Sequence, residues 1–425
     1  MLDYIIRNAK LPGKDGTFDI GINDGLFTEI SQSLQEKGHR EFDAKGYLAT
    51  PPFVDSHFHM DATLSLGLPR LNNSGTLLEG IQIWSELKPE LTAEALKSRA
   101  LELLNWSVAK GTLAIRTHVD VTDPSLLAVD VLLEVKEEMK EWVDIQLVAF
   151  PQDGLLRTDG GKDLLLAALD KGVDVVGGIP HFERTMGEGS TAISWLCGVA
   201  ESRGLLVDMH CDETDDPLSR HIEQLVYETH RLGLGNRVTA SHLTSMHSMD
   251  NYYVSKLLPL MAESGIQVIC NPLISIHIQG RHDSYPKRRG LTRVPELLES
   301  GVNVAFGHDC VMDPWYPMGS HDMLEVAHMG AHCLQMMGTS QADTLFEMIT
   351  SRGAEVMKLE KYGIKKGNPA DFVILQAGSV MESLRLRPNR LAVFRSGTMI
   401  ASSPETLSTV KLGGRETKVS FRRAE

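Results

Sequence analysis

The segment Tyr47-Leu-Ala-Thr-Pro-Pro-Phe-Val-Asp-Ser-His-Phe-His-Met-Asp61 joins an apolar run to two histidines that are two residues apart. Successive side chains of a strand point to opposite faces, so His57 and His59 are expected to project to one side, close enough to bind one metal ion. The carboxyl ends of parallel strands face the ligand crevice of α/β folds. The segment therefore predicts a strand that leads into a metal site, with the remaining ligands supplied by other strand ends.

Seven more β-rich runs follow, separated by segments with helical periodicity. Apolar residues recur at intervals of three and four in segments 92–109 and 126–141, for example. The eight expected strands cover residues 49–54, 113–117, 144–150, 173–177, 205–209, 237–240, 266–270 and 302–306. Eight alternating strand and helix units are typical of a (β/α)8 barrel of the TIM type. We assign this metal-dependent catalytic barrel to residues 48–365.

The two chain ends share a pattern of short strands and tight turns. Asp-Gly dipeptides at 15–16 and 24–25 separate short apolar segments, which indicates hairpins. Similar segments recur at 370–375, 391–394 and 395–400. Neither end is large enough to form a core by itself. We therefore expect one small, discontinuous β-sandwich domain built from residues 1–47 and 366–425.

The composition narrows the range of functions. The 425 residues carry a net charge of -14, which argues against a nucleic-acid surface because such surfaces are basic. Five dispersed cysteines without a C-x-x-C pair indicate reduced thiols. The N-terminus lacks a signal-peptide pattern, and no stretch of about 18 apolar residues occurs. The sequence thus predicts a soluble cytoplasmic protein that acts on a small neutral or cationic molecule, without a membrane or nucleic-acid partner.

Polar and titratable residues follow most of the expected strands. Three imidazoles and one carboxylate would form a shell of nitrogen and oxygen ligands that suits Zn²⁺ or Fe²⁺, with Mn²⁺ as a further option, and leaves a position for water. The expected ligands are His57, His59, His210 and Asp309. His118 and His181 are weaker candidates that could lie behind these ligands or outside the pocket. His308 should face away from the ion if its neighbour Asp309 faces it.

A series of short stretches extends over nearly the whole chain. They are Pro51-Pro-Phe-Val-Asp-Ser-His-Phe-His-Met-Asp61, Ser74-Gly-Thr-Leu-Leu-Glu-Gly80, Arg116-Thr-His-Val-Asp120, Ala149-Phe-Pro-Gln-Asp-Gly154, Pro180-His-Phe-Glu183, His210-Cys-Asp-Glu213, Thr239-Ala-Ser-His242, Tyr285-Pro-Lys-Arg-Arg-Gly290, Phe306-Gly-His-Asp309 and Asp313-Pro-Trp-Tyr316. With this series, the sequence resembles the metal-dependent amidohydrolase superfamily and, within it, the bacterial cytosine deaminases.

The resemblance implies one catalytic metal ion, bound by the four expected ligands. It implies that Glu213 shuttles a first proton to the substrate ring and that His242 orients or activates the attacking hydroxide. A second proton would be relayed by Glu213 or Asp309 to the leaving ammonia. The implied substrate pocket includes Leu77, Phe150, Gln152 and Trp315, with the Gln152 amide on the pyrimidine edge. We expect Cys310 to lie beside them. The fifth strand carries no lysine that could bridge a second metal ion.

One residue departs from the family pattern. Cytosine deaminases usually have a second aspartate after the metal-binding one, whereas this sequence has Cys310. A protonated thiol carries no charge and should tolerate a methyl group at the C5 edge of a pyrimidine. We therefore expect deamination of 5-methylcytosine to thymine and ammonia, with cytosine and 5-fluorocytosine as secondary substrates.

Other functions remain open at this stage. The chain could be an ordinary cytosine deaminase, or a deaminase of isocytosine, creatinine-like or aminotriazine rings. Ring-opening hydrolysis, as in hydantoinase-like enzymes, is disfavoured by the missing lysine. A non-catalytic metal- or base-binding protein would not require Glu213 and His242. The sequence does not determine the metal or the assembly, although a homo-oligomer is expected.

Overall fold

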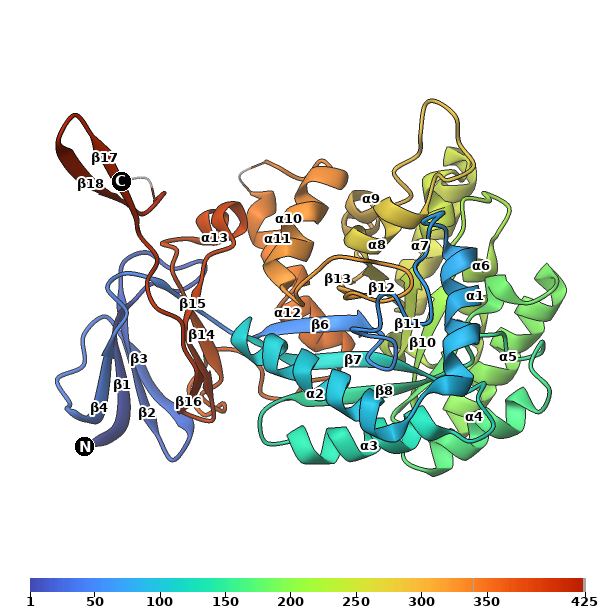
Figure 1. The fold of residues 1–425 in the computed structure, drawn as a ribbon, viewed down its shortest axis with the longest axis horizontal. Helices are drawn as coiled ribbons and strands as arrows, with labels where there is room; N and C mark the ends of the chain where they lie inside the picture. The colour runs from blue at the N-terminus through green and yellow to red at the C-terminus, as the bar shows by residue number, and fades with distance from the viewer. Residues whose placement is uncertain (339, 423–425) are drawn as a thin grey trace.

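The computed structural model describes residues 1–338 and 340–422. Eight parallel strands follow one another in sequence order around a nearly closed barrel (Figure 1). They are β6 (Phe53–Phe58), β7 (Thr112–Asp120), β8 (Asp144–Phe150), β9 (Val175–Gly178), β10 (Leu206–Cys211), β11 (Val238–His242), β12 (Gln267–Cys270) and β13 (Val304–Phe306). The (β/α)8 barrel predicted from the sequence is confirmed.

Helices surround the barrel, both on its outer face and at the carboxyl ends of its strands. They are α1 (Leu77–Leu87), α2 (Ala93–Ala109), α3 (Leu127–Met139), α4 (Gly161–Asp170), α5 (Met186–Arg203), α6 (His221–Arg231), α7 (Asn251–Ser264), α8 (Pro272–Ile278), α9 (Val294–Glu299), α10 (Met323–Cys333), α11 (Gln341–Met348) and α12 (Ser351–Val356). The expected start of α2 is explained by Thr92, whose hydroxyl accepts a hydrogen bond from the Ala95 N–H (3.2 Å).

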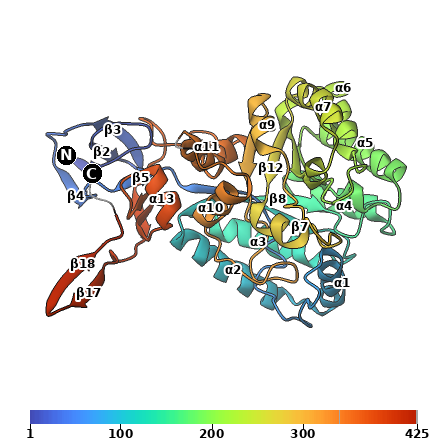
Figure 2. The same cartoon turned by 90° about the horizontal axis from the view of Figure 1, so that it is seen from above.

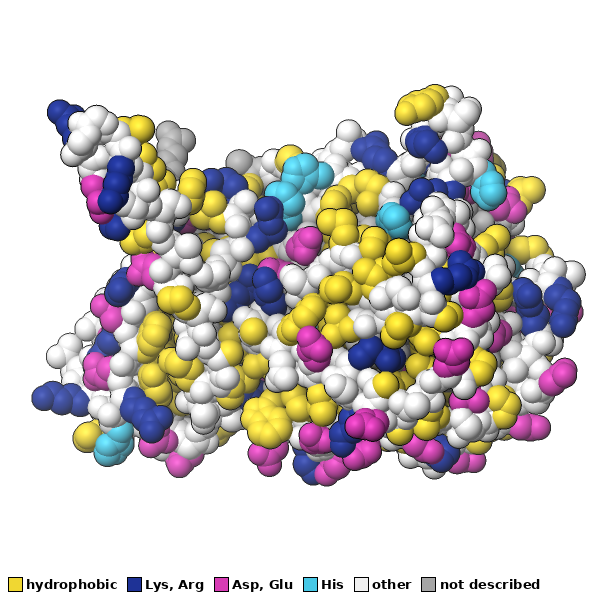
Figure 3. All heavy atoms as spheres, viewed as in Figure 1, with side chains coloured by type: hydrophobic (Ala, Val, Ile, Leu, Met, Phe, Trp, Pro, Cys, Tyr) yellow, Lys and Arg dark blue, Asp and Glu magenta, His cyan; other side chains and the backbone are white. Residues whose placement is uncertain are grey.

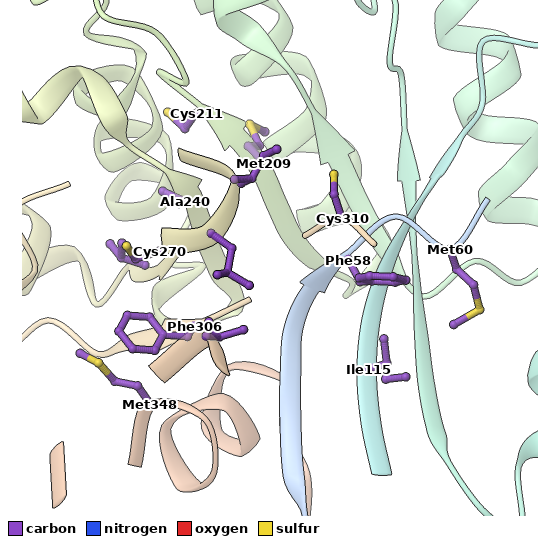
Figure 4. Packing of buried hydrophobic residues seen from close by; sticks show 14 of the residues in the cluster. Phe58, Met60, Ile115, Met209, Cys211, Ala240, Cys270, Phe306, Cys310 and Met348 are labelled. Carbon is purple, nitrogen blue, oxygen red and sulfur yellow. The ribbon is translucent and has the colours of Figure 1, made fainter. Parts of the chain in front are cut away.

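Side chains alternate along the barrel strands between the helical layer and the barrel interior. On β10, Met209 and Cys211 belong to the hydrophobic cluster beneath the helices (Figure 4). The intervening Asp208 and His210 are buried on the interior side, where they meet polar groups from other strands. This period of two separates the apolar core from the polar barrel interior.

The barrel closes between its first and last strands through a single bridge, which pairs Phe58 with Asp309. The Asp309 N–H donates to the His57 carbonyl (2.8 Å), and the His59 N–H donates to the Asp309 carbonyl (3.0 Å). The seam of the barrel therefore joins the backbones of three residues that were expected to bind metal.

The first strand differs from the expectation of one continuous segment at 49–54. Residues Leu48–Thr50 form β5, which pairs with a strand from the C-terminal region, and the barrel strand β6 starts only at Phe53. Pro51 and Pro52 separate the two strands because proline has no N–H to donate to a sheet. β6 also runs on to Phe58, so His57 lies within the strand rather than after it.

Strands from both chain ends form two facing sheets at one end of the molecule (Figures 1 and 2). One sheet contains β1 (Leu2–Ala9), β2 (Phe18–Asn23), β3 (Leu26–Ser31) and β4 (Gly38–Asp43); the other contains β5, β14 (Phe372–Leu375), β15 (Arg390–Arg395) and β16 (Thr398–Ala401). Phe27 meets Phe372 between them, with ring centroids 5.8 Å apart. The expected Asp24-Gly25 hairpin is present, and both residues have positive φ (50° and 73°).

Two C-terminal elements lie outside these sheets. Helix α13 (Val380–Leu386) packs against α10 and α11, and the hairpin of β17 (Ser408–Leu412) and β18 (Arg415–Val419) projects away from the body of the molecule (Figures 1 and 2). On the face seen in Figure 3, acidic and basic side chains are interspersed over the barrel helices. Among the described helices, none has the length and apolar character needed to cross a membrane.

Candidate metal centre and substrate pocket

A cavity of about 480 Å³ opens at the carboxyl ends of the barrel strands. Most of the residues expected in the site line it, namely His59, Leu77, Gln152, His210, Glu213, His242, Asp309, Cys310 and Trp315. They lie at or after the carboxyl ends of five strands, β6, β8, β10, β11 and β13, which only the closed barrel brings together. His57 lies directly beneath the cavity and is fully buried.

The four expected metal ligands converge at the floor of this cavity. His59 Nε2 lies 3.0 Å from His210 Nε2 and 3.5 Å from Asp309 Oδ1. His57 Nε2 lies 3.8 Å from the same carboxylate oxygen. Ligand atoms bound tetrahedrally to one ion at about 2.0–2.1 Å are separated by roughly 3.3 Å, so these distances are close to those of a shared ion.

The protonation of the imidazoles also fits a metal ion. The buried His57 Nε2 has no hydrogen-bond partner among the residues that the structure describes. Burial, and then the neighbouring imidazoles, lower the pKa values of His57 and His210 well below the ordinary value. Neutral imidazoles have lone pairs available for coordination, whereas protonated ones do not. His57, His210 and His242 have ligand atoms within 4.8 Å of one another, as do His57, His59 and His118.

Unusual backbone conformations direct two of these side chains into the site. His242 ends β11 with φ of 74°, and Asp309 follows β13 with φ of 71°. Residues other than glycine rarely adopt such values, which cost about 1–3 kcal/mol each and tend to occur at functional sites. The seam hydrogen bonds of Asp309 to β6 offset part of this cost.

Glu213 is buried beside the proposed metal ligands. Its Oε1 lies 3.4 Å from His242 Nδ1, and His242 Nε2 lies 3.8 Å from Asp309 Oδ2. Burial, and then the Asp309 carboxylate, raise the pKa of Glu213 well above its ordinary value. A carboxyl group in this environment can hold a proton near neutral pH and release it to a bound molecule.

Cys310 forms part of the cavity wall next to Asp309. Its thiol donates to Asp309 Oδ1 (3.5 Å). Burial, and then the nearby Asp313, raise the pKa of this thiol well above its ordinary value, so it stays protonated and uncharged. Asp313 itself, with its pKa raised to about 6 by burial, accepts the backbone N–H groups of Trp315 and Tyr316.

Two expected pocket aromatics occupy different positions. Trp315 lines the cavity, with its ring 6.3 Å from that of His59. Phe150 is not among the cavity-lining residues: its ring stacks on His210 at 4.1 Å and 19°, behind the imidazole. Phe150 therefore supports a proposed metal ligand instead of framing the cavity. Nothing in the spacing of strand ends distinguishes these two positions.

The two weaker histidine candidates lie close to the proposed ligands, and His308 has the orientation expected for it. His118 is buried behind His57 and donates from Nδ1 to the Phe58 carbonyl (3.3 Å). His181 lines the cavity and donates to the His210 carbonyl (3.1 Å), and burial lowers its pKa to about 4. His308 is directed away from the cavity and donates to the Cys310 carbonyl (2.9 Å).

Gly80 of helix α1 packs closely against the ring of Trp315. A Cβ atom on Gly80 would lie 2.3 Å from the Trp315 ring. We expect Gly80→Ala to displace the ring and lower kcat/KM by about 10-fold or more, since small misplacements of a positioning group have such effects. Gly198→Ala on α5 is the matched control, because its Cβ would meet nothing within 4 Å. Steady-state kinetics of both variants check this; equal kcat/KM values would contradict it.

Residues 40–401 match the model of the amidohydrolase family. The chain belongs to this family. N-isopropylammelide isopropyl amidohydrolase of Pseudomonas sp. strain ADP is 31% identical to this chain, and the match covers 94% of this chain and 97% of that protein. Pterin deaminase of Rhizobium rhizogenes is 28% identical over 94% of both chains.

The fold also matches solved structures. The crystal structure of 5-methylcytosine deaminase from Klebsiella pneumoniae with 5-fluorocytosine is 43% identical and superposes with a TM-score of 0.92, covering 94% of this chain and 98% of that one. The same enzyme liganded with phosphonocytosine matches equally well. The present chain is thus a metal-dependent enzyme of the amidohydrolase family.

Proposed function

We propose that this chain hydrolyses the exocyclic C–N bond of free pyrimidine bases, most readily converting 5-methylcytosine to thymine and ammonia. Cytosine and 5-fluorocytosine are expected as weaker substrates. The observation that carries the proposal is the neutral Cys310 thiol in the wall of a cavity that also contains the buried acid Glu213. The 43% identity to the Klebsiella 5-methylcytosine deaminase supports it.

One divalent ion would be held by His57, His59, His210 and Asp309. We propose that this ion is Fe²⁺ or Zn²⁺, with Mn²⁺ as an alternative. When bound, such an ion acts as a Lewis acid and lowers the pKa of water toward neutrality. The missing lysine on β10 leaves no bridging ligand for a second ion.

The residues of the chain supply the proton transfers. Addition of water to the carbon that bears the amino group requires a proton on the adjacent ring nitrogen, and Glu213 is placed to deliver it. His242 contacts both Glu213 and Asp309, so it can orient the attacking oxygen between them. The hydroxyl formed on that carbon then gives up its proton, which passes through Glu213 or Asp309 to the amino group. A carbonyl forms as the C–N bond breaks and ammonia leaves, and the other proton of the attacking water restores Glu213.

The pocket side chains would then select the ring. Gln152 offers an amide donor and acceptor to the polar edge, and Trp315 and Leu77 cover apolar ring surface. The uncharged thiol of Cys310 would face the C5 substituent. A methyl group in a matched apolar slot contributes about 1–3 kcal/mol, so the preference over cytosine is expected to be about 10-fold or somewhat more.

The ratio of kcat/KM for 5-methylcytosine to that for cytosine tests this substrate assignment. We expect wild type and Cys310→Ala to prefer 5-methylcytosine, and Cys310→Asp to shift the ratio toward cytosine by about 10-fold or more, because a carboxylate there disfavours an apolar methyl group. A clear preference of the wild-type enzyme for cytosine would sink the assignment. Ammonia release with an intact ring distinguishes deamination from ring opening.

We further propose a cytoplasmic homo-oligomer. All five cysteines are free and buried, as in proteins of reducing compartments.

The proposed oligomer rests on the β17–β18 hairpin, which exposes Val410 and Leu412 on one face. An isolated two-stranded hairpin is only marginally stable, so a second copy of the chain that covered this face would stabilise it. Light scattering of the full chain measures its assembly.

A further inference from the structure

A group of polar residues lies in the barrel interior, directly beneath the proposed metal ligands. Arg116 on β7, Asp208 on β10 and Ser241 on β11 are each 0% exposed. None of them lines the cavity, so none can touch a substrate bound there. The reaction described above leaves them without a role, although two of the sequence stretches that resemble the family include Arg116 and Ser241.

The contacts of Ser241 determine the direction of its hydrogen bonds. Its hydroxyl oxygen lies 2.6 Å from Asp208 Oδ1 and 2.9 Å from His57 Nδ1. A serine hydroxyl has one proton, and an ionised carboxylate can only accept. Ser241 therefore donates to Asp208 and must accept from His57, which places the proton of that imidazole on Nδ1.

This arrangement leaves His57 Nε2 with its lone pair free. The same atom is buried, and within residues 1–338 and 340–422 it has no hydrogen-bond partner. Asp208 has a counter-charge within the barrel, because Arg116 Nη1 donates to Asp208 Oδ2 (3.0 Å), and Arg116 is itself fixed by Gln146 and by the Val356 carbonyl. The contacts therefore connect the Arg116–Asp208 ion pair, through the Ser241 hydroxyl, to the proposed metal ligand His57.

We propose that Ser241 is a positioning residue that, with Asp208, locks His57 in the tautomer and ring orientation needed to bind the metal ion. Groups that accept the second ring N–H of a metal-binding histidine fix its tautomer and orientation, and their loss typically weakens metal binding about 10- to 100-fold. This inference rests on the metal site of the proposed function and not on the identity of the substrate.

Metal affinity of the Ser241→Ala variant tests the proposal. We expect the metal-free variant to bind Zn²⁺ or Fe²⁺ about 10- to 100-fold more weakly than wild type in competition with a chelating dye. The matched control is Ser245→Ala, which removes another buried hydroxyl that donates to the Ser219 carbonyl and contacts no histidine. It should bind metal as wild type does. Circular dichroism and thermal unfolding show whether both variants are folded.

A second measurement reports the tautomer without metal or substrate. In ¹⁵N-histidine-labelled metal-free protein, the His57 resonances, identified by their loss in His57→Gln, should show a protonated Nδ1. In Ser241→Ala they should show a mixture of tautomers. If Ser241→Ala binds metal as tightly as wild type, or if His57 of the wild-type protein is protonated on Nε2, this inference is wrong and the proposed function is unaffected. Failure of the wild-type protein to bind any divalent ion would instead overturn the proposed function.

Discussion

Replacement of Glu213 by glutamine is expected to lower kcat by about 10³-fold or more while the protein keeps its metal ion. Glutamine has the same shape but cannot take up and release a proton. Glu213 is not one of the four expected ligands, and its Oε1 contacts His242 instead (3.4 Å). Its pKa is raised well above the ordinary value by burial and by Asp309, which suits a group that delivers protons. Ammonia release and metal content of the purified variant measure the two effects.

Glu183→Gln provides the matched control for this experiment. Glu183 is also a buried carboxyl group with a raised pKa, but it accepts the Leu156 N–H and does not line the cavity. Its replacement should leave turnover unchanged. A Glu213→Gln variant that loses metal, without a separate defect in turnover, would favour a metal- or base-binding protein over an enzyme.

The second large effect is expected from loss of a metal ligand. His210→Asn removes the Nε2 atom that lies 3.0 Å from His59 Nε2, and we expect the variant to lose its metal ion and about 10³-fold or more of its activity, because the remaining three ligands no longer complete the shell. Chelation of the wild-type enzyme should have the same effect. Added Fe²⁺, Zn²⁺ or Mn²⁺ should restore wild type, and the most effective ion identifies the preferred cofactor.

His308→Asn is the control for the loss of a buried imidazole near the site. The asparagine amide can take the place of His308 Nδ1, which donates to the Cys310 carbonyl, and His308 is directed away from the cavity. This variant should keep its full complement of metal as measured by inductively coupled plasma mass spectrometry. Full metal content in His210→Asn would contradict the ligand set.

Much of the site could be predicted because the barrel obeys a simple geometric rule. Eight parallel strands bring their carboxyl ends together, so His59, His210 and Asp309 meet although about 250 residues separate the first from the last. Local signals were equally reliable for the Asp24-Gly25 turn and for the helical periodicity of residues 92–109, where the structure has α2.

The residues around the ligands could not be placed in this way. Ser241 and Asp208 support His57 from beneath, Phe150 stacks behind His210, and Gly80 makes room for Trp315. Each contact joins segments that are far apart in sequence, and each depends on the stagger and tilt of the strands. The sequence contains Pro51 and Pro52, but it did not predict that they separate β6 from β5, which pairs with β14.

The sequence by itself therefore determined the barrel, and through strand order and resemblance to a family it predicted the metal-binding type of the residues in the site and the proposed acid, Glu213. Only the tertiary structure decided which nitrogen of His57 is free, which carboxylate holds it there, and which aromatic ring faces the cavity. These features depend on distances of a few ångströms across the closed barrel. The periodicity of a sequence carries strand order and side-chain direction, whereas such distances arise only when all eight strands pack together.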